Sequence, residues 1–147
     1  MTNTEITYLI DTNIVSELLK YESDFTLLKN MSQHGGDMAI SVITFDELVY
    51  GAKKNTSPRK QNAILDFIKN DVCDNFERIE FDEKSAVIHA NIQAKMEQLG
   101  NPVPYDDSMI AATALANNMT LVTRNSKHFE CLAREFGLRL ENWFLDS

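Results

Sequence analysis

Four acidic residues, from three separate parts of the sequence, are candidates for one shared site. Each stands near a point where a helix is expected to begin. They are Asp11, Glu47 and the adjacent pair Asp106 and Asp107. Hard divalent cations such as Mg²⁺ and Mn²⁺ prefer carboxylate and amide oxygens as ligands and keep several of their waters. Two such ions roughly 4 Å apart can activate a water molecule and stabilise the leaving oxygen when a phosphodiester bond is cleaved. The residue types therefore indicate metal-assisted hydrolysis, provided that the fold brings these side chains together.

Each acid also has a plainer interpretation, as a residue that caps a helix. The capping residues would be Asp11 for a helix over 12–20, Thr44 with Glu47 as a capping box for 44–54, and Asp107 for 108–117. A cap stabilises its helix by about 1 kcal/mol and needs no catalysis. We favour the metal site because three caps would have to converge on one rim by chance, but each acid taken singly leaves both interpretations open.

The elements that must position these residues alternate along the chain between apolar, β-branched segments and segments of helical spacing. Strands are expected at residues 6–10, 38–43, 77–81, 119–123 and 138–143, and helices at 12–20, 23–35, 44–54, 58–70, 82–99, 108–117 and 126–137. This order predicts an α/β fold with a central parallel sheet of about five strands, flanked by helices on both faces. No repeat or linker divides the chain, so we expect a single domain over residues 1–147.

A parallel sheet would gather the candidate residues at one edge. Ligands of open α/β sheets bind outside the carboxyl ends of the strands. Asp11 follows the first strand, and Thr123 ends the fourth, with Arg124 and Asn125 directly beyond it. Glu47 and the Asp106–Asp107 pair begin helices that we expect at the same rim.

Charge and composition limit the classes of function. The 147 residues carry a net charge of −8, which argues against a broadly basic surface for nucleic acid but allows a nuclease whose acidic cleft is neutralised by cations. Cys73 and Cys131 show no metal-binding spacing and are expected to be free thiols in a reducing compartment. We expect no signal peptide, no membrane span and a cytoplasmic location.

Four segments together resemble a PIN-domain ribonuclease of the VapC toxin type. They are LIDTNIVSELLK, SVITFDELVYGAKK, PYDDSMIAATALANNMTLVTRNSKHFE and LRLENW. The resemblance extends from about Tyr8 to Trp143, and the order and spacing of the segments carry it, since the tripeptide DTN alone is a weak motif.

The resemblance implies an endoribonuclease that hydrolyses RNA with a water bound to Mg²⁺ or Mn²⁺. By position, Asp11, Glu47 and Asp107 match the acids that hold and orient the ion, whereas Asp106 is an extra neighbour ranked below Asp107. Asn125 stands where many members have a further acid, so a stable second ion is not expected without an RNA phosphate. Because clustered carboxylates repel one another, at least one should have a raised pKa when no metal is bound.

Supporting and RNA-contacting residues have alternatives that the sequence leaves open. Thr12 and Asn13 beside Asp11 can order a ligand or a metal-bound water, although we favour Thr12 and Thr123 as plain start and end residues of their elements. Phosphates can meet Arg124, Lys127 and His128, or the set Lys53, Lys54, Arg59 and Lys60, for which a solvated surface is favoured. Tyr50 and Tyr105 can stack on bases, but we expect them at the edge of the core.

Partners follow from the resemblance alone. It implies a cognate antitoxin that presents a basic side chain to the carboxylates, and a homodimer built from helices. Candidate dimer surfaces are Phe25, Leu27 and Leu28 or the helix 58–70.

The rival functions are another Mg²⁺-dependent phosphohydrolase and a PIN-like module that only binds protein. Asn13 counts against an aspartyl-phosphate enzyme, which would need an aspartate there, and the intact acids count against a degenerate site.

Overall fold

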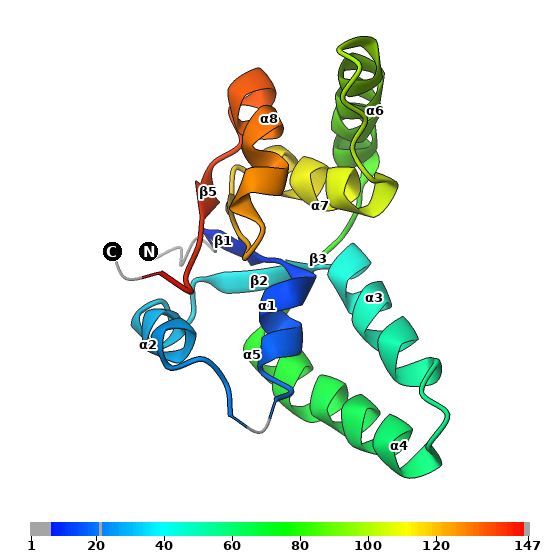
Figure 1. The fold of residues 1–147 in the computed structure, drawn as a ribbon, viewed down its shortest axis with the longest axis vertical. Coiled ribbons are helices and arrows are strands. Elements are labelled where there is room, and N and C mark those ends of the chain that lie inside the picture. Colours follow the sequence, from blue (N-terminus) through cyan, green and yellow to red (C-terminus); the bar gives the residue numbers. More distant parts are fainter. Residues whose placement is uncertain (1–6, 21, 146–147) are drawn as a thin grey trace.

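A five-stranded, all-parallel sheet forms the centre of the protein (Figure 1). The computed structural model describes residues 7–20 and 22–145. The strand order is β3-β2-β1-β4-β5. The strands are β1 (Tyr8–Ile10), β2 (Met38–Ser41), β3 (Glu77–Ile79), β4 (Thr120–Val122) and β5 (Leu140–Glu141). The predicted α/β fold with about five parallel strands is confirmed.

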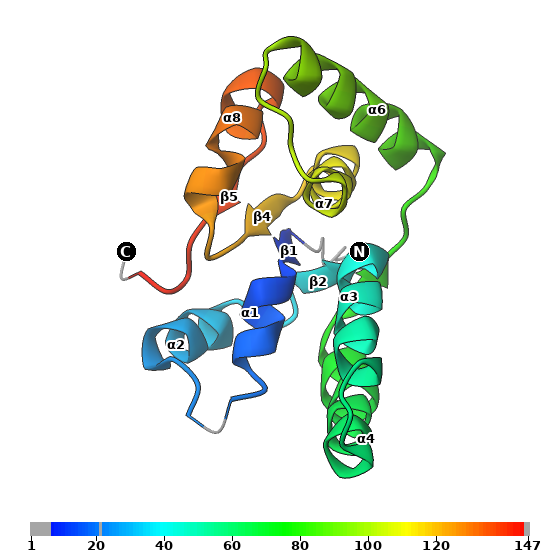
Figure 2. The ribbon, with the colours of Figure 1, turned by 45° about the vertical axis from the view of Figure 1, so that its right-hand side comes forward.

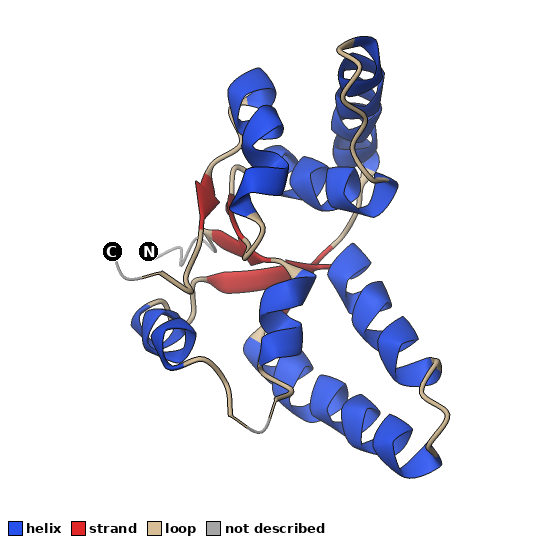
Figure 3. Ribbon diagram, viewed as in Figure 1, coloured by secondary structure: helices blue, strands red, loops and turns tan. Residues whose placement is uncertain are grey.

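Helices cover both faces of this sheet, as Figures 2 and 3 show. They are α1 (Thr12–Glu17), α2 (Phe25–Gln33), α3 (Val42–Lys53), α4 (Pro58–Phe67), the π-helix η1 (Ile68–Val72), α5 (Cys73–Asn75), α6 (Glu83–Gln98), α7 (Tyr105–Ala116) and α8 (Ser126–Phe136). Helices α6, α7 and α8 lie on one face, and α1 to α5 lie on the other.

Neighbouring residues of each central strand enter two different cores. In β1, Leu9 packs with α6, α7 and α8, whereas Ile10 packs with α1, α2 and α3. In β4, likewise, Leu121 lies in the core with Leu9, and Val122 lies in the core with Ile10. A parallel sheet that is buried on both faces needs apolar residues at successive positions, which explains the continuous apolar strands of the sequence.

The start of α3 differs from the predicted capping box. Strand β2 ends at Ser41 rather than at residue 43. The Ser41 hydroxyl caps the helix by accepting a hydrogen bond from the Thr44 backbone amide at 3.0 Å. The box of Thr44 with Glu47 is therefore wrong. Serine is a strong N-cap residue, and its use as the cap places Glu47 in the second turn of α3, free of any capping duty.

The start of α7 is also earlier than predicted. The helix begins at Tyr105, with Pro104 in extended conformation as its N-cap residue, instead of at Ser108. Asp107 is therefore not a cap, and the plainer interpretation of this acid is wrong. Asp106 and Asp107 both lie in the first turn, where the helix dipole favours negative charge.

Other element ends show smaller departures. The predicted helix 58–70 is interrupted, because a π-helical turn follows α4 at Ile68 and leads into α5. Helix α1 stops at Glu17, and the expected strand 138–143 is only two residues long. Asp24 and Asp82 cap α2 and α6, and Gly137 ends α8 in the left-handed conformation.

Side-chain exposure corrects two predictions from the sequence. Tyr50 and Tyr105 are 64% and 65% exposed and do not form the core edge. Leu27 is fully buried, so it cannot contribute to a dimer surface, whereas Phe25 is 81% exposed. His89 and Trp143 are buried. Both cysteines are free, and within the described residues no helix is long and apolar enough to cross a membrane.

Candidate active site

Asp11 lies at the junction of β1 and α1 and is both a cap and the most buried acid of the site. Its side chain accepts hydrogen bonds from the Thr12 amide at 2.8 Å, the Thr123 hydroxyl at 2.8 Å and the Asn13 amide group at 3.3 Å. Only 5% of the residue is exposed. Burial raises the pKa of Asp11, although the bonds from Thr123 and Thr12 oppose the rise. The position is therefore fixed by the surrounding hydrogen bonds.

Glu47 reaches the site from α3 and is tied to the start of α1. The Thr12 hydroxyl donates to Glu47 Oε1 at 2.6 Å and also contacts the Thr44 hydroxyl at 3.0 Å. Burial, followed by the nearby carboxylates of Asp106 and Asp11, raises the pKa of Glu47 to about 7. At least one carboxylate of the cluster thus has a raised pKa, as predicted, with burial as the largest cause and Asp106 as the acid that raises it most.

Asp107 faces His128 across the opposite side of the site. The two residues come from α7 and α8, and His128 Nε2 lies 2.8 Å from Asp107 Oδ2. Burial raises the pKa of Asp107, while the contact with His128 opposes that rise. The pairing was not foreseen, because the sequence places the two residues 21 positions apart and gives no signal that joins them.

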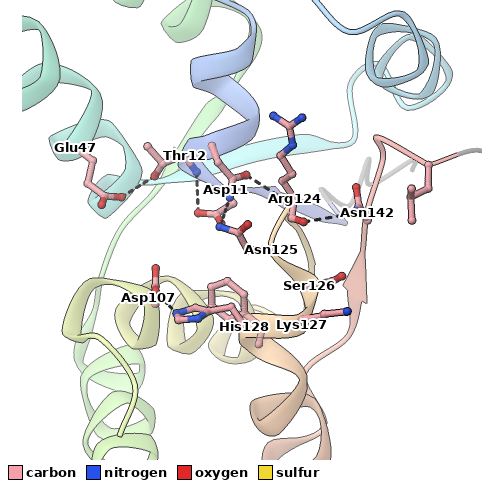
Figure 4. A pocket seen from close by; sticks show the side chains of 13 residues that line it. Asp11, Thr12, Glu47, Asp107, Arg124, Asn125, Ser126, Lys127, His128 and Asn142 are labelled. Atoms are coloured by element: carbon pink, nitrogen blue, oxygen red, sulfur yellow. Dashed lines mark hydrogen bonds and ion pairs between the residues drawn. The ribbon is translucent and has the colours of Figure 1, made fainter.

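These side chains surround one open cavity of about 960 Å³ (Figure 4). Its lining includes the predicted residues Asp11, Thr12, Asn13, Glu47, Asp107, Arg124, Asn125 and Lys127. Asp106 raises the pKa of Glu47 but does not line the cavity, and Thr123 is buried and donates a hydrogen bond to Asp11. The lining also includes Ser126 and Asn142, which were missed. Asn142 directly follows β5, so the rule that ligands gather at the carboxyl ends of strands would have found it.

Thr12 and Thr123 combine the two roles that were considered for them. Thr12 begins α1, and Thr123 directly follows the last residue of β4, close to the plainer interpretation. Each also donates a hydrogen bond to an acidic side chain of the cavity. Asn125 precedes α8 but its side chain makes no capping bond. The side-chain amide of Asn125 is therefore not engaged in capping α8.

The two basic sets occupy different places. Arg124, Lys127 and His128 line the cavity. Lys53 and Lys54 lie at the end of α3, where the α3–α4 pair extends away from the sheet (Figure 1). Lys54 Nζ lies over the Tyr50 ring at 5.4 Å from its centre. Only the first set can meet a ligand in the cavity.

The cavity brings acid, amide and cation together, but not in the close arrangement of a finished metal site. Across residues 7–20 and 22–145, no three His, Cys, Asp or Glu side chains are arranged to hold one metal ion. The carboxylates instead engage hydroxyl groups and an imidazole. Chemically, the arrangement offers oxygen ligands at its base and positive charge at its rim.

Comparison with known proteins identifies the family. The PIN domain model matches residues 8–135. Ribonuclease VapC2 of Haemophilus influenzae is 33% identical over 136 residues, covering 92% of this chain and 97% of the relative. The tRNA(fMet)-specific endonuclease VapC of Shigella flexneri is 33% identical over 138 residues, with the same coverage. The crystal structure of VapBC2 from Rickettsia felis, bound to a DNA fragment from its promoter, matches with a TM-score of 0.78 and 31% identity over 93% of this chain and 98% of that one. The chain therefore belongs to the PIN-domain family, among its VapC ribonuclease toxins.

Proposed function

We propose that the cavity hydrolyses phosphodiester bonds within RNA chains. The observation that carries the proposal is the meeting of Asp11, Glu47 and Asp107 in one cavity whose rim bears Arg124 and Lys127. The three acids supply the catalytic carboxylates, and the Arg124 and Lys127 side chains contact RNA phosphates. Asp106 acts on Glu47 through its charge.

The donor set fits a hard divalent cation, Mg²⁺ or Mn²⁺. Three carboxylates with raised pKa face a shared space, and a cation would offset the repulsion and desolvation that raise them. Asp11, Glu47 and Asp107 would hold the ion, with the Asn125 amide as a neutral neighbour. When bound, such an ion supplies activation of a water molecule for attack on phosphorus.

The remaining residues keep the carboxylates in place. Thr12 orients Glu47, Thr123 and Asn13 orient Asp11, and His128 holds Asp107. Substitution of groups that orient metal ligands in this way typically costs about 10–100-fold in metal affinity or activity. Each of these contacts is therefore part of the proposed active site.

We also propose a protein antitoxin and a homodimer as partners. The R. felis relative was solved as the VapBC2 complex, and a basic side chain of an antitoxin would suit the acidic cavity and the net charge of −8. For the dimer, Phe25 and Leu28 on α2 are exposed and apolar. Leu27 takes no part because it is buried.

The proposal is tested by incubating the purified protein with total cellular RNA in Mg²⁺, in Mn²⁺ and in a chelator. Asp11→Asn and Asp107→Asn are assayed in parallel, with circular dichroism to verify folding. We expect discrete, metal-dependent fragments that both folded variants fail to produce. Initiator tRNA is the first species to examine, since it is the named substrate of the S. flexneri relative. Cleavage that survives both substitutions would refute the site.

A further inference from the structure

Glu17 is a buried acid that the proposed catalytic steps do not use. Its side chain is only 7% exposed, and it is the last residue of α1. A negative charge at the C-terminal end of a helix is unfavourable to the helix dipole, and burying a charge costs free energy unless it is paired. The partners of Glu17 therefore have to offset two costs.

Those partners divide between the two carboxylate oxygens. Glu17 Oε2 accepts a hydrogen bond from the Asp24 amide at 3.3 Å, which connects it to the start of α2. Oε1 faces two cations, Lys20 Nζ at 2.9 Å and Arg124 Nη1 at 3.6 Å. The contact with Lys20 and then the charge of Arg124 are among the causes that lower the pKa of Glu17. The carboxylate is thus charged and directed towards Arg124.

Arg124 is held from several other directions. Its guanidinium carbon lies 4.3 Å from the centre of the Phe144 ring, a cation–π contact. The backbone amide of Arg124 donates a hydrogen bond to Asn13 Oδ1 at 3.2 Å, and its backbone carbonyl accepts one from the Asn142 side chain at 3.4 Å. Asn13 also donates to Asp11, so the backbone of Arg124 is fixed relative to the most buried acid of the cavity.

The guanidinium nevertheless keeps capacity for a ligand. It has five N–H donors, the contact with Glu17 is a single ion pair, and the side chain is 52% exposed at the cavity. Figure 4 shows Arg124 rising from the end of β4 at the rim, on the side of Asp11 away from Asp107. A phosphate bound there would flank the scissile one.

We infer that Glu17 and Phe144 position the Arg124 guanidinium to bind an RNA phosphate that flanks the cleavage point. Arg124 is the phosphate-binding residue, and Glu17 and Phe144 are positioning residues. The inference rests on the proposed function for the identity of the ligand. The buried Glu17 carboxylate thus serves substrate binding, and the rim of the cavity holds a phosphate-binding subsite.

The test measures binding of a fluorescein-labelled 12-mer oligouridine by fluorescence anisotropy, in chelator and at several salt concentrations. Arg124→Ala should weaken binding about tenfold and make the slope of log K against log salt shallower by about 0.7, the value for one phosphate contact on a single strand. Lys69→Met is the control, because it removes an exposed positive charge that neither lines the cavity nor pairs with Glu17. It should leave both quantities nearly unchanged.

Glu17→Gln separates positioning from a structural role. In the wild-type background it should weaken binding about threefold with the salt slope unchanged, because the charge of Arg124 remains. In the Arg124→Ala background it should not weaken binding at all, since its effect passes through Arg124. Phe144→Leu should behave in the same way and serves if Glu17→Gln does not fold.

Two results would overturn the inference. One is an Arg124→Ala variant that binds with the wild-type affinity and slope. The other is a Glu17→Gln variant that binds as tightly as the wild type, or one that loses binding equally in both backgrounds. Failure of the proposed function is seen separately, as a wild-type protein that binds the oligonucleotide through Arg124 but cleaves neither initiator tRNA nor total RNA.

Discussion

The two sides of the cavity hold their acids in different ways. On the side of α1 and α3, Asp11 is buried and accepts three hydrogen bonds, and Thr12 binds Glu47 at 2.6 Å. On the side of α7 and α8, Asp107 is partly exposed and its side chain contacts His128. We call the first side, which consists of Asp11, Thr12, Glu47 and Thr123, the framework. The second side depends on a contact between partly exposed groups, and such contacts contribute little.

The largest effect is expected from breaking the framework at its centre. Asp11→Asn should lower RNA cleavage by about 10²- to 10³-fold, the scale seen when a preorganised electrostatic group is removed from an active site. The fold should persist, because an amide at this position removes a buried charge whose pKa burial has raised. Single-turnover cleavage rates and circular dichroism check both parts, and a folded variant with a tenth of the activity would contradict the framework's importance.

Removing a hydroxyl group from the framework should have an intermediate effect. Thr12→Val and Thr123→Val keep the side-chain shape but delete the bonds to Glu47 and Asp11. Substitution of groups that orient metal ligands costs about 10–100-fold in activity or metal affinity. Cleavage rates over a Mn²⁺ titration measure this loss, and Ser126→Ala is a control because Ser126 also lines the cavity without a bond to either carboxylate. Loss of the same size in the control would show that the threonines are not special.

The other side should tolerate the equivalent change better. His128→Ala removes the contact to Asp107, but both side chains are partly exposed, at 46% and 25%, and contacts between exposed charged groups contribute little. We expect cleavage to fall less than about tenfold. A hundredfold loss with the fold intact would instead make His128 a direct participant in the chemistry.

The smallest effect concerns stability and pH. In the folded protein the pKa of Glu47 is raised from 4.5 to about 7, so between these values the folded state binds more protons than the unfolded state. Stability contributed by this group is present below about pH 4.5 and is lost as the pH rises through about 7. For a partly buried group we expect a change of about 1 kcal/mol after solvent screening.

Thermal unfolding in chelator between pH 5 and 8 measures this dependence. The melting temperature of the wild type should fall over that range, and Glu47→Gln should reduce the fall. Added Mn²⁺ should restore stability most strongly above pH 7, where the carboxylate is free to bind. A wild-type melting temperature that rises with pH in chelator would contradict the assigned direction.

The framework was largely visible in the sequence, because its residues lie at strand ends. Asp11 follows β1, and the parallel sheet brings Thr123 beside it from 112 positions away. The α/β pattern and the rule for strand ends were enough to place both at one edge. The sequence also named Glu47, and its plainer interpretation as part of a capping box is wrong, since Ser41 caps α3.

Long-range side-chain choices were not predictable in the same way. His128 meets Asp107, and Asp106 acts on Glu47, because the tertiary fold brings α7 beside α8 and α3, which no local pattern encodes. Helix starts were misplaced where two signals competed, as at Pro104 and Ser108 for α7. Exposure of Tyr50 and Tyr105 likewise depends on tertiary packing rather than on spacing.

The most direct test of the account is whether the two sides form one catalytic centre. Cleavage of an RNA that the wild type cuts should be measured for Asp11→Asn, Asp107→Asn and the double variant, with folding verified for each. If both acids serve one centre, the double variant should be no slower than the slower single variant, because groups that act as a unit are strongly non-additive. Losses that multiply, or full activity in Asp107→Asn, would contradict a single centre that spans the cavity.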